Sequence, residues 1–212
     1  MEIKDVLALS ISVASFLWSA YTFFVVRFDR GRLRMTQPTL LSLKRDLPKG
    51  WAKIFLRTCL FTTGTKGRVV ENMFLRVRRN NAAPSTFDFW GHTESGKLTL
   101  GSGLFVGPTG VASDHHFNPR EGSADFLFAS GEYVVEVFAT VVGHRKSEKL
   151  MQLAFAVGDQ QAAELLQNPT RELRLYWNAD SHAYHGHIVQ DDPVDPKLIQ
   201  KLVEDVLRNY RF

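Results

Sequence analysis

The chain has 212 residues, a formal net charge of +4 and one cysteine, Cys59. A single cysteine excludes an intrachain disulfide, as expected for a protein of a reducing compartment. The length is enough for a membrane segment followed by one substantial hydrophobic core.

An uncharged apolar run opens the chain. Residues 6–26 carry no charge, and about 20 such residues are what a helix needs to cross a bilayer. Four arginines follow at once: Arg27, Arg30, Arg32 and Arg34. Because positive residues stay on the cytoplasmic side, we expect a single-pass helix in the cell (inner) membrane. The slightly acidic leader, residues 1–5, then lies outside and the C-terminal domain is cytoplasmic.

Two alternatives to a membrane helix stay open. A cleaved signal peptide needs a basic start and an apolar core of about 7–15 residues, whereas this leader is not basic and its apolar run is longer. The small pair Ser19-Ala20 near the end of the run follows a bulky Trp18. The other alternative is a helix buried in a soluble core.

The expected membrane helix has one face of small and hydroxylated residues. Spacings of three and four residues place the following side chains on that face: Ala8, Ser12, Ser15, Ser19 and Thr22. Small residues allow close approach of helices, and their hydroxyls can bond across the contact. The stripe predicts a helix–helix interface, either with further copies of this chain or with a polytopic membrane partner. Three or more copies would form a sealed bundle or a polar pore.

Basic residues concentrate after the apolar run. Residues 27–80 have a net charge of +11, and residues 81–212 have a net charge of −6. We expect residues 27–52, punctuated by Pro38 and Pro48, to form a basic juxtamembrane linker that is attracted to anionic headgroups.

A second basic group, Arg76, Arg78 and Arg79, lies at the end of an expected strand. The planar guanidinium matches phosphate oxygens, so these residues are candidate contacts for a nucleotide or oligonucleotide. A solvated strand end explains the same pattern.

From residue 53 onward, short β-branched and aromatic runs alternate with turn residues. The expected strands are 53–62, 68–78, 85–90, 97–106, 111–116, 124–128, 133–142 and 149–157. Such strands at short, regular spacing indicate a mainly β chain with an antiparallel β-sandwich or barrel.

The segment Gly131-Glu-Tyr133-Val-Val-Glu-Val137 resembles the late strands of immunoglobulin-like and fibronectin-type-III-like domains. In those domains a tyrosine at the start of the penultimate strand closes a corner through its hydroxyl. The resemblance covers residues 53–157 and implies a fold without a function.

The pattern changes after residue 157. Residues 159–166 read as a short helix with Asp159 as its N-cap, and strands are expected at 173–177 and 183–189. These segments complete a β-sandwich domain over residues 53–192. Asp195-Pro196 begins an amphipathic helix within residues 193–212, which covers the domain or docks on a partner.

No catalytic motif for phosphate loops, serine hydrolases or zinc proteases occurs in the sequence. Histidine gives one candidate metal site, because His185 and His187 share a side of an expected strand. Asp114, or one of His115 and His116, is a possible third ligand. Cys59 is interpreted as a small core residue.

Three functions fit these patterns. The first is a non-enzymatic, ligand-controlled membrane effector or pore; its layout resembles small bacterial membrane effectors gated by nucleotides. The second is an accessory subunit that anchors or scaffolds a larger membrane complex. The third is a metal-dependent hydrolase. We expect binding without catalysis, and no cofactor.

Overall fold

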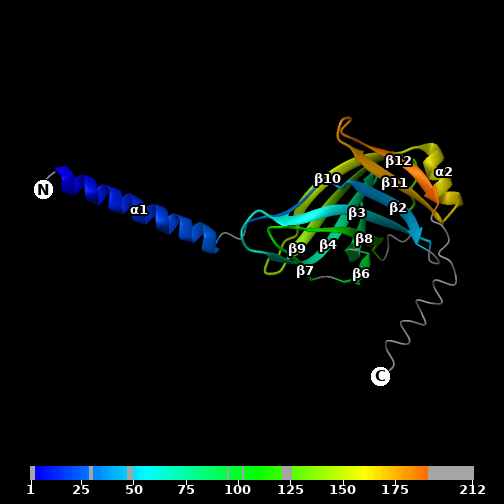
Figure 1. The fold of residues 1–212 in the computed structure, drawn as a ribbon. Coiled ribbons are helices and arrows are strands. Elements are labelled where there is room, and N and C mark those ends of the chain that lie inside the picture. Colours follow the sequence, from blue (N-terminus) through cyan, green and yellow to red (C-terminus); the bar gives the residue numbers. More distant parts are fainter. Residues whose placement is uncertain are drawn as a thin grey trace, which may run out of the picture.

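A computed structural model describes residues 3–28, 31–46, 50–94, 96–101, 103–120 and 126–190. Its elements are an N-terminal helix, twelve strands and a short second helix (Figure 1). The prediction of a mainly β chain with an N-terminal apolar helix, antiparallel strands and a short helix is confirmed. The expected helix within residues 193–212 lies outside the described residues.

The first helix, α1 (Ile3–Phe28), projects away from the β domain (Figure 1). It exceeds the expected span 6–26 at both ends and includes part of the leader. The helix is long and apolar enough to cross a membrane, and none of its most apolar window is buried within the protein. A helix so near the N-terminus also meets the criteria for a signal sequence.

The strands follow in chain order: β1 (Leu33–Met35), β2 (Leu40–Asp46), β3 (Trp51–Thr62), β4 (Arg68–Arg79), β5 (Ser85–Glu94), β6 (Lys97–Leu100), β7 (Leu104–Val106), β8 (Val111–Pro119), β9 (Gly131–Val141), β10 (Glu148–Val157), β11 (Arg171–Asn178) and β12 (Ala183–Gln190). The short helix α2 (Asp159–Gln167) connects β10 to β11 and packs on β11 and β12.

All twelve strands belong to one antiparallel sheet. Its main path is β10-β9-β4-β5-β8-β3-β2-β11-β12, and β1, β6 and β7 pair beside it. The two strands at the ends of this path, β10 and β12, contact each other, and β1 also contacts β10. The sheet therefore curls nearly into a barrel, in agreement with the expected sandwich or barrel class.

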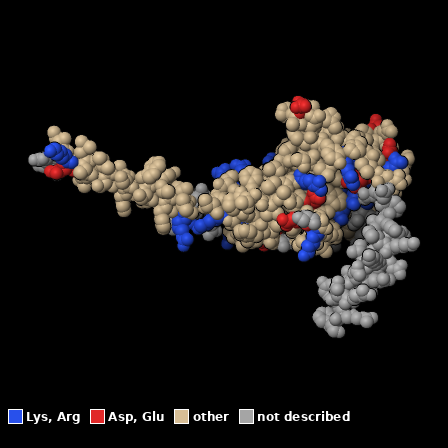
Figure 2. Space-filling model, viewed as in Figure 1, with Lys and Arg blue, Asp and Glu red and all other residues tan. Residues whose placement is uncertain are grey.

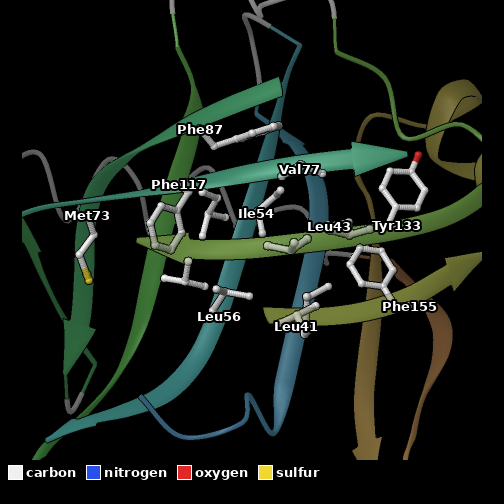
Figure 3. Close-up of a cluster of buried hydrophobic side chains, with 14 of the residues drawn as sticks. Leu41, Leu43, Ile54, Leu56, Met73, Val77, Phe87, Phe117, Tyr133 and Phe155 are labelled. Atoms are coloured by element: carbon white, nitrogen blue, oxygen red, sulfur yellow. The ribbon is translucent and has the colours of Figure 1, made fainter. Parts of the chain in front are cut away.

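One hydrophobic core fills the inside of this sheet (Figure 3). Successive side chains of a strand point to opposite sides, so Leu41 and Leu43 of β2 face inward together with Ile54 and Leu56 of β3. Tyr133 is also fully buried in the core. The intervening residues of each strand necessarily form the outer face.

Tyr133, near the start of β9, makes a hydroxyl-to-backbone contact with the loop before this strand. The hydroxyl of Tyr133 donates a hydrogen bond of 2.6 Å to the carbonyl oxygen of Ala129, and its ring stacks on Phe155. The corner joins the start of β9 to the preceding loop.

The structure corrects the prediction of a linker over residues 27–52. β1 and β2 lie within this range, and β3 already begins at Trp51. Leu41 and Leu43 alternate into the core, a strand pattern obscured in the sequence by the neighbouring basic residues and prolines.

Three smaller predictions also change. The expected strand 97–106 is two strands, because Gly101 and Gly103 adopt positive φ angles between them. Residues 126–128 of the expected strand 124–128 lie in no strand. The N-cap of α2 is Gly158, and Asp159 is its first helical residue.

Candidate functional site

A depression of about 380 Å³ lies on the outer face of four adjacent strands, β11, β2, β3 and β8. Figure 2 shows basic and acidic side chains intermixed on the face that includes β2, β3 and β11. The residues that line the depression are Leu40, Ser42, Lys44, Phe55, Arg57, Asp114, His116, Glu172, Arg174 and Tyr176. Each alternates with inward-facing residues of its strand, so the pleat of the sheet selects this set.

Several polar side chains on this outer face are nearly as buried as the core. Ser42, Lys53 and Glu172 are 3%, 6% and 7% exposed. The hydroxyl of Ser42 donates to Glu172 Oε1 at 2.6 Å, and Arg174 donates to both carboxylate oxygens at 2.9 and 3.2 Å. Burial alone raises the pKa of Glu172, but the bonds from Arg174 and Ser42 outweigh burial and hold this pKa below its ordinary value.

A second ion pair borders the depression. Arg57 donates to the two carboxylate oxygens of Asp114 at 2.6 and 2.8 Å. These hydrogen bonds lower the pKa of Asp114 despite its partial burial. Both carboxylates of the site are therefore ionised at neutral pH and engaged by arginine.

Two lysines surround one aromatic ring. Lys44 Nζ lies 4.8 Å and Lys53 Nζ 5.5 Å from the centre of the Phe55 ring, and Lys53 Nζ lies 4.0 Å from that of Trp90. Lysine over an aromatic face is a favourable cation–π arrangement. The site thus has four cationic side chains, including Lys53, against two carboxylates.

His116 forms the floor beside Phe55, with ring centres 4.4 Å apart in an edge-to-face arrangement. Burial, reinforced by nearby Lys53, lowers the pKa of His116 to about 4, so the ring is neutral at pH 7. Its Nε2 lies 2.8 Å from Thr93 Oγ1. Its Nδ1 is buried and has no hydrogen-bond partner within the described residues. A buried polar atom of this kind is satisfied by a water or a ligand.

The chemistry of this site suits an anion that carries a planar ring. Surplus positive charge attracts phosphate or carboxylate groups. Phe55 and Tyr176 place aromatic rings at the depression, and stacking on aromatic rings is typical of nucleobase recognition. A volume of 380 Å³ lies within the range of small-ligand pockets.

The predicted arginine group on β4 does not belong to this depression. Two strands, β5 and β8, separate β4 from β3. Arg76 lies over the ring of Phe138, with its guanidinium carbon 4.9 Å from the ring centre. Arg76 and Arg78 are exposed on the outer face, whereas Arg79 is paired in register with buried Tyr133. The three guanidinium groups therefore do not converge.

His185 and His187 lie on the same side of β12, as their spacing predicted, and both are exposed. His185 Nε2 is 3.0 Å from Ser181 Oγ, and the ring of His187 stacks on Tyr176. Within the described parts of the chain, no group of three His, Cys, Asp or Glu side chains is placed to hold a metal ion. The predicted metal site therefore has no third protein ligand among the described residues.

The hydroxyl stripe of α1 is exposed along its length. Thr22 Oγ1 donates to the carbonyl oxygen of Trp18 within the same helix. Arg27, Arg32 and Arg34 lie near the junction of α1 with the β domain, and Arg30 lies outside the described residues.

Apart from Asp114 and His116, which the sequence suggested only as metal ligands, the residues of the depression were missed by sequence reasoning. Their signal was present as polar or charged residues on one face of apolar strands: Ser42 and Lys44, Lys53 and Arg57, and Glu172 and Arg174. The pairing of β11 with β2, which are about 130 residues apart, brings the three sets together, and no local pattern reports this pairing.

Comparison of the chain with models of protein families, with curated proteins and with solved structures gives no match.

Proposed function

We propose that the chain is a single-pass membrane protein whose cytoplasmic β domain binds a nucleotide in the depression of β11, β2, β3 and β8. In this proposal α1 is the membrane helix and associates with further copies through its hydroxyl stripe. Occupancy of the depression then controls the assembly, as in a ligand-controlled effector or pore. The finer resemblance to immunoglobulin-like domains rests on the Tyr133 corner and contributes nothing to this function.

The observation that carries the proposal is the combination of Lys44 and Lys53 around Phe55 with the buried, neutral ring of His116. The lysines supply charge for a phosphate group, and Phe55 supplies a surface for a base. The ring of His116 lies beside Phe55 on the floor of the depression and adds no charge there at neutral pH. None of these groups is needed to form the core, which lies on the other side of the sheet.

Binding is tested on the full-length chain in detergent micelles, titrated separately with AMP, GMP, CMP, UMP and inorganic phosphate. We expect saturable binding of at least one nucleotide, detected by isothermal titration calorimetry, and weaker binding of phosphate alone. Lys53→Met removes the charge while it keeps most of the side-chain volume, and it should weaken nucleotide binding at least tenfold. The matched control is Lys97→Met, on an exposed strand outside the depression.

Native mass spectrometry of the same preparation gives the copy number and the mass of any retained ligand. A homo-oligomer that retains a nucleotide mass supports the proposal. A monomer without saturable binding of any of these probes contradicts it and favours the accessory-subunit function, in which the stripe of α1 contacts a different protein.

A further inference from the structure

The end of the β domain next to α1 is held close to the last turn of that helix. Phe28 and Gly31 are three Cα–Cα steps apart, a span of at most about 11 Å. Thr65 Oγ1 donates a 3.4 Å hydrogen bond to the carbonyl oxygen of Val26, and Lys66 Nζ donates to that of Arg27. If α1 spans a bilayer, as the proposed function requires, this end of the domain lies at headgroup level.

Three turns share this end. The turn at 63–67 connects β3 to β4, and the turn at 142–147 connects β9 to β10; both lie near α1 (Figure 1). Val70 near the start of β4 pairs with Val141 at the end of β9, so the turns that adjoin these strand ends lie at the same end of the sheet. The third turn, 107–110, is fixed there by a backbone bond from Thr62 to Gly107.

A basic hollow of about 480 Å³ opens at the same end. It is lined by Gly31, Arg32, Leu33, Arg34, Arg68, Glu148 and Lys149, four cations with one carboxylate. That carboxylate already has partners, since Glu148 lies 3.1 Å from His144 Nδ1 and 3.9 Å from Arg68 Nη1. Lys149 also contacts Glu136. The positive charge of the hollow therefore exceeds its negative charge.

Exposed apolar side chains accompany these cations. Val69, Phe105 and Val142 are 38%, 63% and 54% exposed. Val69 and Phe105 are register partners, and the backbone of Val142 donates to that of Val69 at 3.0 Å, so the three lie close together. The exposed cations Arg145 and Lys146 follow in the same turn as Val142. Apolar side chains next to cations are the combination that enters a bilayer interface.

We infer that this end of the β domain docks on the membrane that α1 spans. It binds the headgroup of an anionic phospholipid in the hollow lined by residues 31–34, Arg68 and Lys149. The hollow receives the phosphate, while Phe105 and Val142 enter the region between headgroups and acyl chains. The inference rests on the membrane helix of the proposed function. It does not depend on the nucleotide site.

Headgroup binding is measured on the full chain in mixed micelles of phosphatidylcholine and phosphatidylglycerol, with native mass spectrometry counting the lipids retained. We expect the chain to retain phosphatidylglycerol, and the double change Arg34→Gln plus Lys149→Gln to lower its occupancy at least fivefold. The control, Arg78→Gln plus Lys97→Gln, removes two exposed cations elsewhere and should leave occupancy unchanged. Equal occupancy in the two variants would overturn the inference.

Docking is measured separately in bilayer nanodiscs with a fluorophore on a single cysteine in a Cys59→Ala background. The positions are Phe16→Cys in α1, Val142→Cys in the docking turn and Leu166→Cys on α2. We expect a lipid-borne quencher to quench labels at 16 and 142 and to spare the label at 166. Quenching at 16 without quenching at 142 overturns the docking but leaves the membrane helix intact. Absence of quenching at 16 would refute the membrane helix itself, and with it both proposals.

Discussion

At the scale of single residues, the outer face of the β domain is unusual because it buries charge. Glu172 and Lys53 are almost inaccessible although they face away from the core. A buried charge without partners costs several kcal/mol. Arg174 and Ser42 provide partners for Glu172, and aromatic rings flank Lys53. The protein thus maintains a charged surface that is preorganised, as a ligand site requires.

Tyr133 gives a direct test of the corner at the start of β9. Tyr133→Phe removes the hydroxyl and leaves the carbonyl oxygen of Ala129 without this 2.6 Å bond. We expect the free energy of unfolding to fall by about 1 kcal/mol, measured by urea titration of the full chain in detergent. Tyr176→Phe, at an exposed ring, is the control and should change little. Equal effects of the two changes would show that the corner bond contributes nothing specific.

His115 should make the stability of the β domain depend on pH. Burial lowers its pKa from 6.5 to about 4 in the folded state, with a further contribution from His92 on β5 and opposed by Asp114. The unfolded chain therefore binds more protons between these two pH values, and stability is lost as pH falls from about 6.5 to about 4. The whole contribution of His115 to the free energy of unfolding is about 3 kcal/mol. His116 adds a contribution in the same direction.

The measurement is the free energy of unfolding across this pH range. His115→Gln should flatten the slope, whereas His187→Gln, at an exposed position on β12, should retain it. The paired carboxylates of Asp114 and Glu172 also have lowered pKa values, so their contribution is lost mainly below about pH 4.5. An unchanged slope in His115→Gln would contradict the assignment.

At the scale of elements, α1 projects away from the β domain (Figure 2), and the side chains of residues 3–27 are exposed. Its charged side chains lie near its two ends, at Lys4, Asp5 and Arg27. The longest run of small and hydroxylated residues on one side of this helix is the stripe of Ala8, Ser12, Ser15, Ser19 and Thr22, and we propose it as the contact between copies.

Ser15→Leu plus Ser19→Leu should weaken self-association at least tenfold, because bulky side chains prevent close approach of the backbones. Analytical ultracentrifugation of the full chain in detergent measures the change. Ser10→Leu plus Ala14→Leu places the same side chains on the opposite side of α1 and should retain the oligomer. Loss of association in both variants, or in neither, would remove the stripe from the interface.

The strands show which local patterns can be read. The alternation in β9 and β10 was visible because inward positions carry aliphatic or aromatic residues over ten or more residues. β2 was missed because Ser42 and Lys44 interrupt its run of leucines. Prolines on both sides of the strand, Pro38 and Pro48, also favoured a linker. Its burial depends on β3 and β11 on its two sides, which propensity alone does not report.

At the scale of the whole molecule, closure of the sheet decides where the two candidate sites lie. The depression needs β11 beside β2, a pairing between distant segments. The basic hollow needs β1 opposite β10, and these two strands contact each other where the curled sheet approaches closure. The arginines and lysines of both sites are visible in the sequence one by one. Their spacing along the chain does not predict that they converge in space.

Local sequence patterns were enough to predict the apolar helix, the mainly β class, most strand positions and the concentration of positive charge after α1. These properties follow from runs and periods within a few residues, and local geometry converts them directly into helix or strand. The folded structure was needed to show that the expected linker supplies strands, that β5 and β8 separate the arginines of β4 from β3, and that Lys44, Phe55, His116 and Glu172 meet on one face. Strand order and register depend on contacts between segments far apart in the chain, and these contacts leave no local pattern.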